Sequence, residues 1–184
     1  MKGRIHEKRF EGDITRLRNP ERIARLEVER VVKLCLEGAQ IKCVLDVGTG
    51  SGLFAEAFVK RGLAVSGVDA NPEMIPAART YVPVGDFRES TAESLPFADA
   101  TFDLVCMGLL LHESDEQLQV LSEARRVVRT RVGILEWAYR EEDFGAPLLH
   151  RLAPEILAEM AKETGFSKFE AIPLTKLVFY RLTV

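Results

Sequence analysis

In VLDVGTGSG (residues 44–52) an apolar run leads directly into three alternating glycines, Gly48, Gly50 and Gly52. The residues that follow, from Leu53 onward, have the pattern of a helix. Glycines at a turn between a strand and a helix let the main chain bend tightly, and they let a ligand approach N–H groups that a Cβ would shield. The stretch therefore predicts a nucleotide-like cofactor at this turn.

Strand-like apolar runs alternate with helical patterns on both sides of this turn, an order typical of a parallel sheet with helices on both faces. Strands are expected at residues 42–47, 63–69, 86–90, 102–108, 132–137, 168–172 and 176–182. Helices are expected at 19–38, with Asn19 as N-cap and Pro20 as the first helical residue, at 53–61, after Asn71, after Ser114 or Asp115 as N-cap, and at 154–165. The last two strands are close enough in sequence to pair as an antiparallel hairpin. The expected fold class is α/β, with a doubly wound, mostly parallel, seven-stranded sheet.

Length and composition favour one water-soluble domain over residues 1–184, since 184 residues are too few for two ordinary domains and a linker. Residues 1–38 are expected to form an N-terminal segment and helix covering the cofactor side, and residues 39–184 the core. No apolar run approaches the roughly 20 residues that span a bilayer, and the N-terminus lacks the apolar stretch of a secretory signal. Three cysteines without CxxC spacing suggest reduced thiols in a cytoplasmic protein.

Charge is unevenly distributed along the chain. Residues 1–33 hold ten Lys and Arg against six Asp and Glu, whereas the remainder holds fifteen against twenty-two. A basic N-terminal helix could contact nucleic acid, but a pI near 5.7 without a dense basic patch argues against that as the main role. No nucleic-acid partner is expected.

The details around the glycines distinguish between cofactors. A dinucleotide fingerprint, GxGxxG counted from Gly48, would end at Leu53, which is neither Gly nor Ala. Asp46 instead precedes the first glycine by two residues, where a carboxylate suits the amino group and sulfonium of S-adenosylmethionine better than a pyrophosphate. Asp69 ends the second strand, where a carboxylate can accept both ribose hydroxyls. These features disfavour a nicotinamide oxidoreductase.

The chain resembles the class I S-adenosylmethionine-dependent methyltransferases, within them the small type 11 group that includes the ubiquinone/menaquinone C-methyltransferases. VLDVGTGSG looks like motif I, VSGVDANPEMI (residues 65–75) like the ribose-binding segment, and AESLPFADATFDLVCMG (92–108) like the stretch through the fourth strand. ILEW (134–137) is similar to the fifth strand. The resemblance implies a Rossmann-like fold and methyl transfer from S-adenosylmethionine, with S-adenosylhomocysteine as product.

The resemblance also implies which residues hold the cofactor. Those around its methionine part would be Asp46, Gly48, Thr49, Gly50 and Gly52; Asp69 would bind the ribose; Ala70 and Met74 would flank the adenine; and Met107 would line the floor. Where the family usually has Gly-Asp-Ala-Glu, this chain has Ser90 followed by Thr91, Ala92 and Glu93. Thr91 can still hydrogen-bond the adenine amino group, but only as a neutral hydroxyl.

Acceptor-side residues are harder to identify, because methyl transfer needs alignment and exclusion of water more than a dedicated base. His112, in the loop after the fourth strand, is the candidate catalytic residue, since His can take a proton near pH 7. Glu136 and Trp137, at the end of the fifth strand, are the other candidates on the substrate side. No His, Cys or Asp spacing indicates a metal site.

The expected acceptor is a small organic molecule, because the chain lacks the Asp/Asn-Pro-Pro-aromatic motif with which base and amide N-methyltransferases of this fold polarise a planar nitrogen. Its identity, and whether C, N, O or S is methylated, stay open. The pocket would be walled by the N-terminal segment, residues 9–22, and by a loop at 138–152, and a homodimer is one way to complete it. The N-terminal segment could equally be a helix packed on the sheet edge. The alternative function is a non-catalytic regulatory module that binds S-adenosylmethionine or its product.

Overall fold

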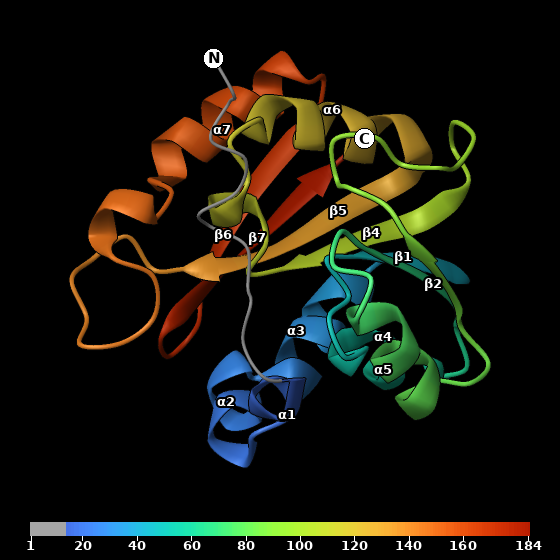
Figure 1. Ribbon diagram of the computed structural model, residues 1–184. Coiled ribbons are helices and arrows are strands. Elements are labelled where there is room, and N and C mark those ends of the chain that lie inside the picture. Colours follow the sequence, from blue (N-terminus) through green and yellow to red (C-terminus); the bar gives the residue numbers. More distant parts are fainter. Residues whose placement is uncertain (1–13) are drawn as a thin grey trace, which may run out of the picture.

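The sheet has seven strands in the order β3-β2-β1-β4-β5-β7-β6 (Figure 1). The computed structural model describes residues 14–184. The strands are β1 (Cys43–Val47), β2 (Ala64–Asp69), β3 (Asp86–Glu89), β4 (Phe102–Gly108), β5 (Val128–Trp137), β6 (Lys168–Pro173) and β7 (Leu177–Thr183). The first five strands are parallel, β7 is antiparallel to β5, and β6 is antiparallel to β7. The predicted mostly parallel sheet with a C-terminal hairpin is confirmed.

Strand β1 has β2 on one side and β4 on the other, so the direction of winding reverses beside it. Val47, the last residue of β1, pairs with Val68 of β2 and with Met107 of β4. The three strands therefore end at nearly the same level. In open α/β sheets, the crevice outside the carboxyl ends of the strands at such a reversal is where ligands bind.

Helices cover both faces of the sheet (Figure 1). One side carries α1 (Ile14–Leu17), α2 (Pro20–Leu26), α3 (Val28–Leu36), α4 (Leu53–Val59) and α5 (Met74–Tyr81), and the other carries α6 (Gln117–Val127) and α7 (Pro154–Glu163). Two short 3₁₀ helices, η1 (Leu111–Glu113) and η2 (Leu148–His150), follow β4 and β5. Each face buries its own apolar cluster, so the helices hold the sheet from both sides. No helix within residues 14–184 is both long and apolar enough to span a bilayer.

The single helix expected at 19–38 is wrong, because the chain forms α2 and α3 with a break between them. Asn19 is the N-cap as predicted, and its side chain accepts the N–H of Glu21 at 2.9 Å. The break falls at Glu27, which has left-handed backbone angles, φ 48° and ψ 43°. Its carboxylate accepts the N–H of Thr175 at 2.8 Å and a hydrogen bond from Arg30 at 2.9 Å. These contacts, one from a distant loop, hold a conformation that a glutamate does not adopt by preference.

The other strand and helix predictions differ from the structure mainly at their ends. β5 begins at Val128, four residues earlier than expected, and pairs there with Phe102 of β4. α6 begins at Gln117 rather than directly after Ser114 or Asp115, and Glu116 is the residue that precedes its first turn. The Ser114 hydroxyl still accepts the N–H of Glu116, at 3.1 Å, in the turn that leads into α6.

Candidate cofactor and acceptor site

A cavity of about 650 Å³ opens at the carboxyl ends of the parallel strands. Its walls come from α1 and α2, from the glycine turn after β1, and from the segments that follow β2, β3, β4 and β5. This volume lies within the range of small-molecule and cofactor sites. The cavity occupies the reversal point at which the sheet order predicts a ligand.

The glycine turn forms one end of the cavity and leaves main chain uncovered. Gly48 and Gly50 have φ angles of 69° and 53°, which glycine adopts without the strain of a side chain. A Cβ on Gly48 would lie 2.9 Å from Cδ1 of Leu110, and one on Gly50 would lie 3.2 Å from Cδ1 of Leu17. Both glycines line the cavity, so the turn fits a ligand that approaches the backbone closely.

Asp69 joins the end of β2 to this turn. Its Oδ2 accepts the N–H of Gly50 at 2.8 Å, and its Oδ1 accepts the N–H of Asn71 at 2.9 Å. A carboxylate has about four acceptor positions on its two oxygens, and Asp69 lines the cavity wall beside the glycine turn. The arrangement suits two neighbouring hydroxyl groups of a ribose.

Asp46 lies beneath the turn instead of facing the cavity. Its carboxyl is 1% exposed, and Oδ2 accepts the Thr49 hydroxyl at 2.8 Å and the N–H of Ala55 at 3.2 Å. Burial raises the pKa of Asp46 to about 7, although both hydrogen bonds oppose that rise. Its observed contacts brace the glycine turn against the start of α4.

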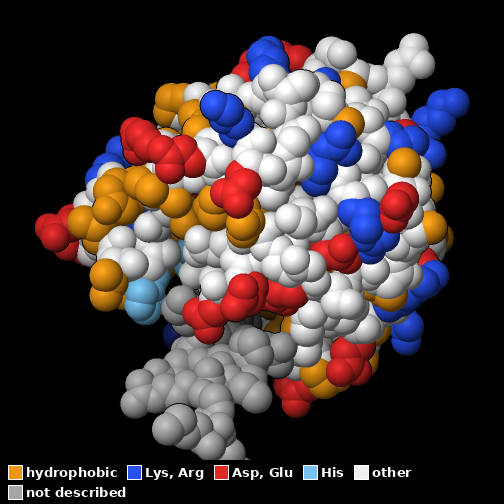
Figure 2. All heavy atoms as spheres, turned by 90° about the horizontal axis from the view of Figure 1, so that it is seen from above, with side chains coloured by type: hydrophobic (Ala, Val, Ile, Leu, Met, Phe, Trp, Pro, Cys, Tyr) orange, Lys and Arg blue, Asp and Glu red, His pale blue; other side chains and the backbone are white. Residues whose placement is uncertain are grey.

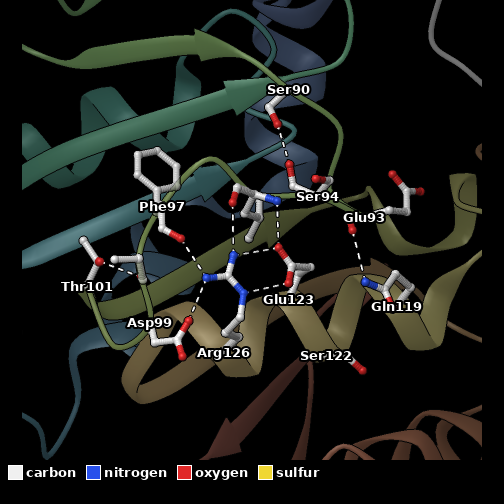
Figure 3. Close-up of polar contacts among 12 residues, drawn as sticks. Ser90, Glu93, Ser94, Phe97, Asp99, Thr101, Gln119, Ser122, Glu123 and Arg126 are labelled. Carbon is white, nitrogen blue, oxygen red and sulfur yellow. Dashed lines mark hydrogen bonds and ion pairs between the residues drawn. The ribbon is translucent and has the colours of Figure 1, made fainter.

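The loop after β3 forms the side of the cavity next to Asp69, and Arg126 of α6 holds that loop in place (Figure 3). The Arg126 guanidinium donates to the carbonyls of Leu95 and Phe97 at 3.0 and 2.7 Å. It also pairs with Glu123, which accepts the N–H of Leu95 at 2.8 Å. One arginine on a helix thus provides hydrogen bonds to two backbone carbonyls of the loop, and it fixes the course of the segment that carries Glu93.

His112 and Glu136 meet where the segment after β4 reaches the cavity wall. Nδ1 of His112 lies 2.7 Å from Oε2 of Glu136, and the backbone N–H of His112 donates to Oε1 at 3.2 Å. Glu136 is 1% exposed and does not line the cavity, whereas His112 does. Burial opposes protonation of His112, but the hydrogen bond and charge of Glu136 outweigh it and raise the pKa of the ring.

Glu113, the residue after His112, adds a second titratable group to the same part of the cavity wall. One of its carboxylate oxygens lies 4.0 Å from Nε2 of His112. Burial raises the pKa of Glu113 to about 7, and the negative charges of Glu136 and Asp69 act in the same direction. Glu113 can therefore change protonation near neutral pH, and His112 keeps its proton to a higher pH than an ordinary histidine does.

The loop after β5 forms the outer wall around a single buried arginine. Arg151 is 5% exposed, and its guanidinium donates to the carbonyls of Ala138, Arg140, Phe144 and Ala146 at 2.6 to 3.0 Å. Trp137, at the end of β5, lines the cavity beside this loop. Four carbonyls bound by one side chain give a defined path to a segment that contains little regular secondary structure.

Ten of the residues predicted for the site line the cavity: Gly48, Thr49, Gly50, Asp69, Ala70, Met74, Ala92, Glu93, His112 and Trp137. Five do not: Asp46, Gly52, Thr91, Met107 and Glu136. Thr91 is flanked by Ser90 and Ala92, which do line the cavity, and Met107 is fully buried in the core under α6. Gly52 packs against α5 at the start of α4.

Several lining residues were not among the predicted site residues, notably Arg22, Leu110 and His150. The N-terminal segment was expected either over the pocket or on the sheet edge, and its described part lies at the cavity through Leu17 and Arg22. Residues 9–13 of that segment lie outside the described residues. On the face seen in Figure 2, Lys and Arg side chains are scattered among acidic ones.

Comparison with known proteins shows that the chain is similar to methyltransferases. A family model described as a methyltransferase domain matches residues 45–134. The demethylmenaquinone methyltransferase of Chlorobaculum parvum is 37% identical over 95 residues, which cover 51% of this chain and 39% of that protein. The enzyme of the same name from Thermotoga maritima is 29% identical over 175 residues, with 75% of each chain covered. This chain spans about two fifths of the length of the first curated relatives it matches.

The fold agrees with these matches. The crystal structure of a SAM-dependent methyltransferase from Aquifex aeolicus superimposes with a TM-score of 0.79 at 24% identity, covering 92% of this chain and 95% of that one. The chain is therefore similar in sequence to methyltransferases over its central part, and it has the fold of an S-adenosylmethionine-dependent methyltransferase.

Proposed function

We propose that the chain transfers a methyl group from S-adenosylmethionine to a small-molecule acceptor. The observation that carries this proposal is the open glycine turn with Asp69 beside it, joined by the hydrogen bond from Gly50, in a chain that matches a methyltransferase family model. The cofactor would lie with its adenosyl part along Asp69, Ala70, Met74 and Ala92, and the acceptor would enter at the end lined by His112 and Trp137.

S-adenosylmethionine would supply an electrophilic methyl group on a positively charged sulfur. The chain's own contribution is to align the acceptor, exclude water and, where the acceptor is a weak acid, remove its proton. His112 is placed for that proton transfer. Its Nδ1 is held by Glu136, which favours the tautomer with the proton on Nδ1 and leaves Nε2 as the basic nitrogen. Glu136 is thus proposed as a positioning residue and His112 as the base.

The alternative, a regulatory module that binds S-adenosylmethionine without transferring its methyl group, would use the same cofactor contacts. It would require neither a buried Glu136 nor a histidine with a raised pKa at the other end of the cavity. Those two features favour the enzyme. A cytoplasmic location and a homodimer stay predictions from the sequence.

Two measurements test the proposed function. Calorimetric titration of the protein with S-adenosylmethionine, S-adenosylhomocysteine and NAD should show binding of the first two and not of NAD. A screen of fractionated metabolites with methyl-labelled cofactor should then show label in a small-molecule fraction. No affinity for either adenosyl ligand would contradict the proposal, and binding without transfer to any fraction would favour the regulatory module.

A further inference from the structure

Arg22 brings a cation to the cavity, and among the described residues its guanidinium has a single hydrogen-bond partner. It lies on α2 and lines the cavity, and Nη1 donates to the carbonyl of Leu17 at 3.0 Å. Within residues 14–184 this is the one hydrogen bond of its guanidinium, which has five N–H donors. Burial lowers its pKa, although the charge of Glu113 opposes that effect. A partly buried guanidinium with unused donors is suited to an anionic ligand.

The position of Arg22 is fixed by contacts between the N-terminal helices and the glycine turn. Arg18 donates to the carbonyl and the hydroxyl of Ser51 at 2.9 and 3.3 Å, and it pairs with Glu56 of α4 at 2.5 Å. Leu17 lies against the open side of Gly50. Because α2 begins directly after these anchors, Arg22 lies in the wall next to the glycine turn, at the end of the cavity proposed for the methionyl part of the cofactor.

The other charged side chains around the cavity are acidic. The lining carries five acidic side chains, Asp69, Glu93, Glu113, Asp115 and Glu116. Among the described lining residues, Arg22 carries the only permanent positive charge. A ligand carboxylate that enters this cavity is repelled by these acidic side chains and attracted by Arg22.

We infer that Arg22 binds the methionyl carboxylate of S-adenosylmethionine. This inference rests on the proposed function, because it assigns a contact within the same cofactor site. The planar guanidinium can form two parallel hydrogen bonds with a carboxylate, which would fix the direction of the methionyl chain as well as attract it. Asp46, which the sequence places near the amino group and sulfonium, is buried beneath the turn and is no partner for that carboxylate.

A pair of cofactors that differ by one group tests the inference. S-adenosylmethionine and its decarboxylated form, S-adenosylmethioninamine, share the adenosine and the sulfonium, and only the first carries a carboxylate. By calorimetry, the wild-type protein should prefer the carboxylated form by about 10- to 100-fold, the range expected for a charge-assisted pair. In Arg22→Gln that preference should fall to within about threefold, while affinity for the decarboxylated form stays close to that of the wild type.

Arg25→Gln is the matched control. Arg25 lies on the same helix, over the ring of Phe144 at 4.7 Å, and does not line the cavity. This variant should keep the full preference. Arg22→Lys should keep part of it, because an ammonium supplies the charge without the paired geometry.

The outcomes separate the inference from the proposed function. If the wild type binds neither cofactor, the proposed function fails. If the wild type binds S-adenosylmethionine but Arg22→Gln retains the full preference, only the inference about Arg22 is overturned. If Arg22→Gln keeps the preference for S-adenosylmethionine but loses affinity for the acceptor, the inference is also overturned, and Arg22 is then assigned to an anionic acceptor.

Discussion

The carboxylate of Glu136 holds His112 at two points, its ring and its backbone. Oε2 lies 2.7 Å from Nδ1, and Oε1 accepts the backbone N–H at 3.2 Å. Glu136 is on β5 and His112 is in η1, so the pair also ties the loop after β4 to the neighbouring strand. The ring is thereby oriented by a residue that does not itself reach the cavity.

Glu136→Gln should lower the pKa of His112. The charge of Glu136 favours the protonated ring, so removing that charge favours the neutral form. The chain has three histidines, so NMR titration of the ring signals can follow His112, with His150 as the internal control. Once an acceptor is found, the rising limb of the kcat/KM profile should move to lower pH, and kcat should fall by about 10- to 100-fold because the ring is no longer oriented. An unchanged titration midpoint would show that Glu136 does not govern this proton.

Asp69→Ala should weaken binding of S-adenosylhomocysteine by at least about tenfold, while His112→Ala should leave it within about twofold. The first change removes the proposed acceptor of the ribose hydroxyls and the brace of the Gly50 N–H. The second removes the proposed base and none of the proposed cofactor contacts. Calorimetry gives both affinities, and the melting temperature without ligand reports whether the fold is retained. Equal losses in the two variants would mean that the cofactor and acceptor ends are misassigned.

Gly48→Ala should reduce affinity for S-adenosylhomocysteine by more than about tenfold. The new Cβ would need a left-handed backbone and would lie 2.9 Å from Leu110. Gly62→Ala is the matched control, since Gly62 has φ 79° with nothing within 4 Å of its Cβ position. Gly62→Ala should cost about 1 kcal/mol in the free energy of unfolding and leave the affinity unchanged. If both variants bind equally well, the turn does not contact the ligand closely.

Asp46→Asn should remove a pH dependence of stability. The folded-state pKa of Asp46 is raised from 3.8 to about 7, so the folded state binds the proton more tightly than the unfolded state. Stability of the wild type should therefore fall, by a few kcal/mol at most, as pH rises from about 4 to about 7. Urea unfolding at pH 5 and pH 8 should show a smaller difference between the two pH values in Asp46→Asn.

Asp103 should affect the pH dependence of stability in the opposite direction to Asp46. Although burial opposes it, the N–H groups of Lys42 and Cys43 and the side chain of Arg129 hold the pKa of Asp103 at about 2. Its contribution to stability is present above its ordinary pKa and is lost as pH falls toward about 2. Asp103→Asn should therefore destabilise the protein at both pH 5 and pH 8. An Asp46→Asn variant that behaves in the same way would contradict the raised pKa of Asp46.

The sequence was sufficient for the features that depend on local patterns. All seven strands were predicted, because buried parallel strands are nearly continuous apolar runs between turn residues. The glycine turn was predicted for the same kind of reason, since positive φ angles at Gly48 and Gly50 belong to a residue type that the sequence displays directly. Asp69 was placed at the cavity because it is the last residue of a strand.

The remaining features depend on contacts between distant segments. Nothing local marks Glu27 as a helix break, since it is held by the backbone of Thr175, 148 residues away. The direction of the Asp46 side chain follows from its hydrogen bonds to Thr49 and Ala55, whose positions depend on the three-dimensional course of the turn and not on a local sequence pattern. Arg22 is one of many basic residues near the N-terminus, and only the packing of α2 against the turn distinguishes it.

The loop after β5 has a property that bears on how such a protein acquires new substrates. Its path depends on the carbonyls that Arg151 binds, and carbonyls are present whatever the side chains are. Residues along the loop can therefore be exchanged while the loop keeps its course and the strands stay in register. Substitutions in this loop can in this way change which acceptor is bound, while the residues proposed to hold the methyl donor stay the same.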